Sequence, residues 1–436
     1  MLPRSAKRLA TFRQRALLIN RNYTLLWLGG LISQIGDILF MFMLILWVGT
    51  LLHTQSAAPL AVSGVLLADA LPALLIGPFA GVFVDRWPKQ RTMRLMDALR
   101  AVLVCALLPI SGPLPLPLAL KLTVIYLVVA AVSSLSQFFT PATKAMLKEV
   151  VSEEQLTRAS ALTVGAGACA WTIGSACAGI CYVSLGAGWA MAVNAASFVC
   201  SWVLVGRMRV SAAERRVSPH PTALRRVLTE LRDGLRFIQG QLQLRTLLLT
   251  WSLYSFGWGI VNVLAFFYIT QNIQVPLSLF GLWIAVTGSG GILGTALVDR
   301  AVAKRGATSV YTRALLFAGV MAVVATVPNQ AIIALVGFTL NGVVMVQAEV
   351  LLGPLVLLAT PEQMVGRVFS VLGTVTTLST LLATFLSGYL SSTLLHGVVV
   401  HLPTGELNAT NLLHIGAGVI IFVGGLHAAR QFRRRR

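Results

Sequence analysis

The sequence contains the stretch Gly77-Pro-Phe-Ala-Gly-Val-Phe-Val-Asp-Arg86, and its pattern returns as Gly291-Ile-Leu-Gly-Thr-Ala-Leu-Val-Asp-Arg300. Each stretch has a Gly, seven further residues and an Asp-Arg pair, and the two are 214 residues apart. A second match joins Glu154-Gln-Leu156 to Glu362-Gln-Met364 at an offset of 208 residues. Two matches at nearly the same offset predict that the two halves of the chain are copies of one unit.

The sequence around these stretches is mostly apolar. Of 436 residues, 56% are hydrophobic and 11% are charged, against roughly 25% charged in soluble domains. The apolar runs are long enough to cross a hydrocarbon layer ~30 Å thick. This composition excludes soluble enzymes, secreted disulfide scaffolds and disordered chains. It predicts an all-α membrane protein with twelve transmembrane helices in two pseudo-symmetric six-helix bundles, near 23–52, 60–84, 95–112, 118–139, 159–183, 188–206, 246–271, 277–298, 310–327, 330–356, 366–395 and 410–429.

The chain has a net charge of +20, and the positions of its basic residues follow the expected topology. All but one of the 34 Lys and Arg residues fall in the two terminal segments or in alternate loops, and the exception is Lys121 near an external helix end. Loops rich in Lys and Arg stay cytoplasmic. We therefore expect a multi-pass protein of the plasma membrane with both termini cytoplasmic, and no nucleic acid as a partner.

The longest polar segment separates the sixth and seventh expected helices. Its 222–240 part places Leu residues at helical spacing beside Arg residues, which predicts an amphipathic helix. This helix could face anionic lipid headgroups, pack against the bundle, or simply connect the halves. We expect the protein to be a monomer. Its predicted parts are a basic cytoplasmic N-terminus (1–22), an N-terminal bundle (23–206), a cytoplasmic linker (207–245), a C-terminal bundle (246–429) and a basic cytoplasmic tail (430–436).

Several motifs identify a family. The loop Gly81-Val-Phe-Val-Asp-Arg-Trp-Pro-Lys-Gln-Arg91 resembles the signature between helices two and three of the major facilitator superfamily. Further stretches resemble its twelve-helix drug-efflux branch, which includes macrolide and siderophore exporters: Arg21-Asn-Tyr23, Ser33-Gln-Ile-Gly-Asp37, Phe139-Thr-Pro-Ala142 before helix five and Gly366-Arg-Val-Phe369 before helix eleven. The resemblance implies an antiporter that uses the proton gradient and needs no cofactor.

The sequence departs from the family pattern at two places. Pro88 stands where the family normally has Gly. Helix five carries Gly174-Ser-Ala-Cys-Ala-Gly179, without the Pro that proton antiporters often have in this region. The small residues still predict close helix packing, but the missing Pro weakens a motif-based argument for export.

Three acids lie inside expected helices, away from the basic loops: Asp37, Asp69 and Glu349. A carboxylate at the centre of a membrane helix costs about 2.5–3.5 kcal/mol on insertion scales. We predict that Asp37, with Gln34 one turn before it, and secondarily Glu349 carry the coupling proton or bind a cationic group of the substrate. The alternative is a structural carboxyl that is hydrogen-bonded to a neighbouring helix. Asp69 is a weaker candidate, three residues before Pro72.

Bulky and polar residues share helix faces with two of these acids, as in the wall of a cavity. An aromatic face on helix seven could take apolar or cationic ligands, although such stripes also face lipid or pack in the core. The predicted cavity-lining residues are Trp27 and Met41 near Asp37, Asn341 and Met345 near Glu349, and Tyr254, Trp258 and Asn262 on helix seven.

The two Asp-Arg pairs predict a conformational latch. An Asp at the end of helix two can accept hydrogen bonds from a helix N-terminus and can pair with loop Arg residues. Such a cluster would hold one conformation and release the other. We assign Asp85, Arg86 and Arg91 to the first latch and Asp299 and Arg300 to the second; the alternative is a charge cluster that only sets topology.

Together these features predict a secondary active transporter. It would use the proton gradient to export a small amphipathic organic compound, such as a drug, macrolide or siderophore, by alternating access. The alternatives are an importer, a lipid or metabolite carrier of the same fold, a non-transporting receptor, or an integral-membrane lipid-modifying enzyme. The sequence has no Gly-x4-Gly-Lys-Ser/Thr loop, nucleophile–base constellation or metal-ligand cluster, so we expect neither enzyme activity nor a metal.

Overall fold

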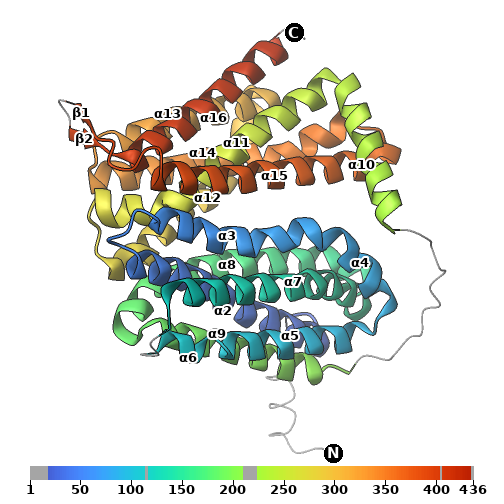
Figure 1. The fold of residues 1–436 in the computed structure, drawn as a ribbon. Helices are drawn as coiled ribbons and strands as arrows, with labels where there is room; N and C mark the ends of the chain where they lie inside the picture. Colours follow the sequence, from blue (N-terminus) through green and yellow to red (C-terminus); the bar gives the residue numbers. More distant parts are fainter. Residues whose placement is uncertain (1–17, 113–115, 210–222, 403–404, 434–436) are drawn as a thin grey trace, which may run out of the picture. The chain divides into compact units, whose positions relative to one another are not determined.

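The computed structural model describes residues 18–112, 116–209, 223–402 and 405–433. Most of the predicted N-terminal segment, part of the linker and the end of the tail lie outside these residues. The helices are α2 (Arg21–Leu51), α3 (Ala58–Leu75), α4 (Gly77–Arg86), α5 (Lys89–Cys105), α6 (Leu108–Ser111), α7 (Leu118–Val150), α8 (Glu153–Leu185), α9 (Ala187–Gly206), α10 (Ala223–Gly240), α11 (Leu242–Phe267), α12 (Leu277–Arg305), α13 (Ala307–Thr326), α14 (Ala331–Leu358), α15 (Val365–Ser392) and α16 (Ala409–Arg433) (Figure 1).

The helices confirm the predicted all-α membrane class. Eleven of the described helices are long and apolar enough to cross a membrane. The third expected span is formed by α5 and the short α6, and α5, with 17 residues, is too short to belong to this set of eleven. At the end of α11, a π-helical turn covers Tyr268–Asn272. Such turns inside helices are rare and often lie at functional sites.

Proline residues set some helix boundaries but not all. The expected span at 60–84 breaks between α3 and α4, where Pro78 occupies the first turn of α4. Trp87 is extended (φ −94°, ψ 150°) before Pro88, as the residue before a proline usually is. The prediction that the fourth span ends near residue 139 is wrong: α7 continues through Pro141 to Val150. A proline removes only one helical hydrogen bond, and the helix tolerates this loss.

The described residues form two compact units. Among the described residues, the first contains 18–41, 75–112, 116–174 and 185–209. The second contains 42–74, 175–184, 223–402 and 405–433. The second unit therefore combines α10 to α16 with α3 and with the C-terminal parts of α2 and α8.

Glycines allow helices of the second unit to pack backbone to backbone. On α12, a Cβ at Gly290 or Gly294 would overlap the carbonyl oxygens of Thr339 or Val343 on α14. On α8, a Cβ at Gly179 would lie 2.5 Å from the Leu277 carbonyl oxygen. Small residues bring membrane helices together in this way. The close packing predicted for the Gly174–Gly179 stretch is confirmed at Gly179.

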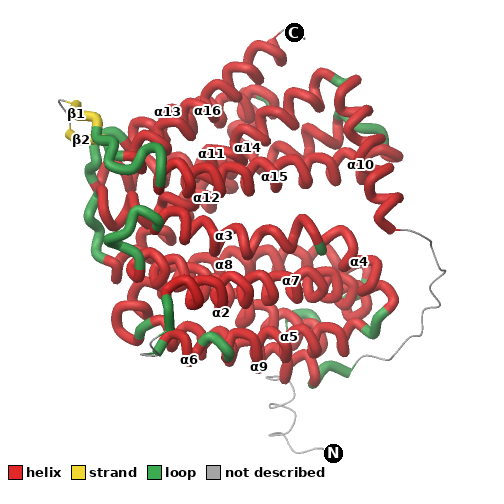
Figure 2. Tube along the Cα trace, in the orientation of Figure 1, coloured by secondary structure: helices red, strands yellow, loops and turns green. Residues whose placement is uncertain are grey.

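Two short strands precede α16, and the sequence did not predict them. Strands β1 (Val400–Leu402) and β2 (Gly405–Leu407) pair antiparallel (Figure 2). His401 and Glu406 face each other across the pair, 3.3 Å apart. Both side chains are largely exposed, so we expect this contact to contribute little stability.

Candidate functional site

The first candidate, Asp37, lies part-way along α2 in the first unit. Its side chain is half-buried, and Gln34, one turn earlier, is exposed. The residue before it, Gly36, packs against α9: a Cβ there would lie 2.8 Å from Asn194 Oδ1 and would overlap Ser197 Oγ. The sequence predicted Asp37 from its position in an apolar run, but the contact with α9 is not visible in the sequence.

The two residues predicted beside Asp37 are both half-buried. Trp27 donates its indole Nε1–H to the carbonyl oxygen of Leu162 on α8, at 2.9 Å. This bond joins α2 to α8 and fixes the ring. Met41 is the last residue of α2 that belongs to the first unit. Trp27 therefore contributes to helix packing whatever its role toward a ligand.

The other two candidate acids lie in the second unit, and both are exposed. Asp69 is in α3, three residues before Pro72 inside the same helix. Glu349 is on α14, and Tyr254 of α11 packs against the buried core to which Met345, four residues before Glu349 on α14, belongs. The acid and the aromatic residue that the sequence predicted separately therefore lie on two helices that share one core. Tyr254 also packs against Trp251, with ring centroids 4.8 Å apart.

The remaining predicted cavity residues have different surroundings. On α11, Trp258 is 46% exposed and Asn262 is half-buried. Asn341 donates its side-chain N–H to the carbonyl oxygen of Ala318, at 3.0 Å, and so joins α14 to α13. Met345 is buried in the hydrophobic core of the second unit.

The predicted latch residues lie at helix ends and on exposed surfaces. Arg86 is exposed in the last turn of α4, and Arg91 is exposed in the first turn of α5. The side chain of Asp85 lies outside the described part of the structure. Asp299 and Arg300 are exposed, but α12 continues past them to Arg305. The helix therefore runs past the expected end of this span near residue 298.

The structure contains a buried ion pair that the sequence analysis missed. Arg100 donates from Nη2 to Asp97 Oδ1, and both residues are buried in α5. Arg100 lies inside the expected span 95–112 but was grouped with the basic residues of the preceding cytoplasmic loop. The spacing Asp97-Ala-Leu-Arg100, three residues on a helix, was the available signal.

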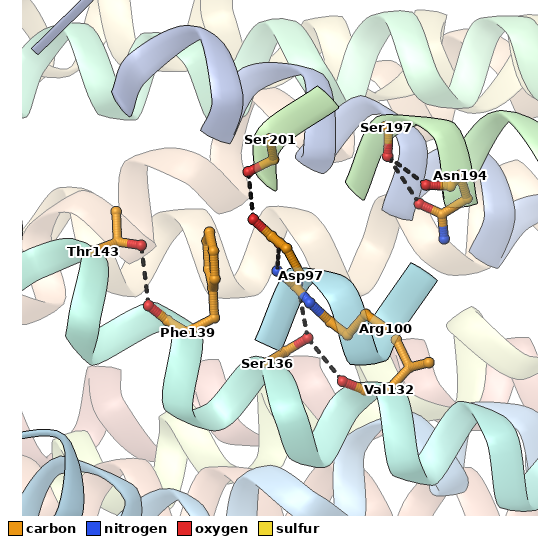
Figure 3. A network of polar contacts seen from close by, with 9 residues as sticks. All are labelled: Asp97, Arg100, Val132, Ser136, Phe139, Thr143, Asn194, Ser197 and Ser201. Carbon is orange, nitrogen blue, oxygen red and sulfur yellow. Dashed lines mark hydrogen bonds and ion pairs between the residues drawn. The ribbon is translucent and has the colours of Figure 1, made fainter. Parts of the chain in front are cut away.

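Residues on two neighbouring helices surround this pair (Figure 3). The second carboxylate oxygen of Asp97 accepts a hydrogen bond from Ser201 Oγ on α9, at 2.7 Å. Arg100 Nη1 donates to Ser136 Oγ on α7, at 3.3 Å. The guanidinium carbon lies 4.4 Å from the ring centroids of both Phe139 on α7 and Phe198 on α9. We call these six residues the Asp97 cluster: Asp97, Arg100, Ser136, Phe139, Phe198 and Ser201.

A second ion pair joins the amphipathic helix α10 to α15 within the second unit. Asp233 on α10 accepts from Arg367 on α15, at 3.3 Å, and both side chains are partly exposed. A Cβ at Gly234 would lie 2.6 Å from the Arg367 carbonyl oxygen, and Ile238 is buried. In its described part, the helix predicted over 222–240 therefore packs against the bundle.

Comparison with known proteins agrees with this fold. Residues 26–384 match the Major Facilitator Superfamily. The chain therefore belongs to the major facilitator superfamily of membrane transporters.

Two similar proteins are named for efflux, and a third is named only as a transporter of the same superfamily. The chain is 28% identical to the multidrug efflux pump Tap of Mycolicibacterium fortuitum over 74% of this chain and 78% of that one. It is 25% identical to macrolide efflux protein A of Streptococcus pyogenes over 56% and 57% of the two chains. It is 26% identical to the MFS-type transporter YfiS of Bacillus subtilis over 62% and 61%. The match spans less than two thirds of the length of the last two proteins.

Solved structures share the fold at low identity. A bacterial homologue of the iron transporter ferroportin, in its inward-facing state, has a TM-score of 0.70 at 17% identity and covers 94% of this chain and 98% of that one. A variant of the nucleoside transporter NupG has a TM-score of 0.73 at 10% identity, over 94% and 100%. At these identities the likeness establishes the transporter fold and not the transported compound.

Proposed function

We propose that this transporter exports a small amphipathic organic compound in exchange for protons. The observation that carries the proposal is the placement of Glu349, an exposed carboxylate on the apolar helix α14, which shares a buried core with Tyr254 of α11. Ionisable residues inside membrane helices are expensive to insert and usually mark ion or substrate pathways. The relatives named for macrolide and multidrug efflux support the direction and the class of compound.

The proposed roles of the residues follow from their chemistry. Glu349 and Asp37 would each bind a proton after the substrate has left and release it before the next substrate binds. The ring of Tyr254, packed on Trp251, would offer an apolar and polarisable surface to the compound. The energy comes from the proton gradient, and no bound cofactor is required.

Transport by the purified protein in liposomes tests the proposal. The probes are radiolabelled erythromycin and ethidium, which are amphipathic and carry a basic or cationic group. With an acidic interior, the wild type should accumulate more of a probe than protein-free liposomes, which trap a basic compound unaided, and nigericin, which collapses the pH gradient, should abolish the excess. Accumulation only with an acidic exterior would indicate a proton symporter and would contradict proton-coupled exchange.

The role of Asp37 is tested in the same liposomes. Asp37→Asn should lose gradient-driven accumulation, because the amide of Asn cannot bind and release a proton as a carboxyl group does. Glu154→Gln is the matched control, since Glu154 is an exposed acid in the first turn of α8, and it should transport normally. Unchanged accumulation in Asp37→Asn would remove Asp37 from the mechanism.

A further inference from the structure

The Asp97 cluster joins three helices of the first unit. Both charged residues come from α5, and the residues that contact them come from α7 and α9. These two helices are the main packing partners of α5. Asp97 is fully buried and Arg100 is 2% exposed. The cluster therefore fixes α9 relative to α5 and α7 through an ion pair, hydrogen bonds and ring contacts.

Stability alone is a weak explanation for this ion pair. Taking two charges out of water is unfavourable, and their attraction offsets that cost only when the remaining polar atoms are also satisfied. Arg100 Nε is buried and has no hydrogen-bond partner in the described part of the chain. Apolar residues of similar volume often replace such pairs without loss of stability. The charges are explained better if the ion pair fixes the position of α9 relative to α5 and α7.

The same helix α9 also sets the position of α2. Ser201, which donates to Asp97, lies beside Gly29: a Cβ there would be 3.4 Å from Ser201 Oγ. Two turns further along α2, Gly36 packs directly on α9. The residues of α9 that make these contacts lie at spacings of three and four, on one face of the helix: Asn194, Ser197 and Ser201.

We propose that Asp97 and Arg100 are positioning residues for proton coupling. They hold the face of α9 that α2 packs against, and this face fixes the backbone at Gly36 and therefore the place of Asp37. Neither residue exchanges the coupling proton in this account. The proposal rests on the proposed role of Asp37 and adds the two residues through which its geometry is set.

The test replaces the charged pair by apolar residues of similar size. The double variant Asp97→Leu with Arg100→Met removes both charges together, so that no unpaired charge remains. Asp233→Leu with Arg367→Met is the matched control, because it removes an ion pair from α10 and α15 in the second unit. A second variant, Ser201→Ala, removes only the hydrogen bond between α9 and Asp97 and leaves the ion pair in place.

Two measurements separate positioning from stability. The first is proton-driven uptake of erythromycin in liposomes, divided by its counterflow exchange, which needs no proton movement. The second is the distance distribution between spin labels at Leu28→Cys on α2 and Val199→Cys on α9, both exposed, in a chain whose native cysteines are replaced. Thermal unfolding in detergent reports whether each variant is folded.

We expect the Asp97–Arg100 double variant to fold and to exchange substrate, while its ratio of driven uptake to exchange falls about 10- to 100-fold, as misplacement of a reacting group by ~1 Å can cause. The distance distribution should broaden, and Ser201→Ala should change both quantities in the same direction by less. The control pair should leave them unchanged. If the double variant does not fold, Ser201→Ala decides alone.

An unchanged ratio and an unchanged distance distribution would overturn the proposal. Failure of the proposed function looks different: the wild type itself would show no proton-driven uptake. In that case the distance distribution still decides whether the Asp97 cluster sets the packing of α9 on α2.

Discussion

Asp97 and Glu349 are both carboxylates on transmembrane helices, but their surroundings are opposite. Asp97 is fully buried, paired with Arg100 and bonded to Ser201. Glu349 is exposed and forms no ion pair with any residue that the structure describes. The two oxygens of the Asp97 carboxylate are both engaged, one by Arg100 on the same helix and one by Ser201 on α9. The difference supports the two proposals made above, a positioning role for Asp97 and a proton site at Glu349.

The largest expected effect comes from removing one partner of the buried ion pair between Asp97 and Arg100. Arg100→Ala leaves Asp97 buried without its partner, which costs about 3–5 kcal/mol in comparable cases. We expect the variant to unfold or to lose most of its yield, measured by size-exclusion chromatography and thermal unfolding in detergent. Arg232→Ala, an exposed Arg on α10, is the control. A normal unfolding temperature for Arg100→Ala would show that the pair is not a structural charge.

A smaller effect is expected where α12 and α14 pack backbone to backbone. In Gly294→Ala the new Cβ would overlap the Val343 carbonyl oxygen, and forcing a methyl group into packed structure costs about 1–3 kcal/mol. Thermal unfolding should report this loss. Gly373→Ala on α15 is the matched control, since a Cβ there meets nothing within 4 Å. Equal stability of the two variants would mean that α12 and α14 are not in close contact.

The latch prediction concerns transport more than stability. Arg91→Gln removes an exposed charge from the first turn of α5 and should leave unfolding unchanged. If the loop charges hold one conformation, both driven uptake and exchange should fall several-fold, because the conformational change is common to both. Normal rates of both in a normally inserted Arg91→Gln carrier would favour a charge cluster that only sets topology.

The smallest effect is expected at the ion pair between α10 and α15. Both side chains are partly exposed, and such pairs contribute about 0–1 kcal/mol. Asp233→Asn should therefore change the unfolding temperature little, and less at high salt. A loss as large as that of Arg100→Ala would remove the distinction between buried and exposed ion pairs in this chain.

The sequence was sufficient for the class of fold, because eleven of the described helices contain an apolar run that is long enough to cross a membrane and can be read directly. It failed where a charged residue lies inside a helix. Arg100 follows several basic residues, so it was grouped with the cytoplasmic loop before the third expected span. Only the contacts with Ser201 and Phe139, from distant parts of the chain, explain why a charge is buried there.

The candidate site was also predicted only in part, because its residues are visible in the sequence but the contacts between its helices are not. Asp37 and Glu349 stand out as acids in apolar runs, so their type and position are visible in the sequence. Tyr254, which packs against the same core as the helix of Glu349, lies on another helix about 95 residues away, and no local pattern joins the two. The extension of α7 through Pro141 was missed because a proline usually ends a predicted helix.

The most direct test of the central claim is proton-driven uptake by Glu349→Gln, compared with its counterflow exchange, in liposomes loaded at acidic pH. Glu362→Gln, an exposed acid before α15, is the control. The account predicts that Glu349→Gln loses gradient-driven accumulation of erythromycin but keeps exchange and thermal stability. Accumulation at the wild-type level would contradict it, because Glu349 could then not be the proton site of the second unit.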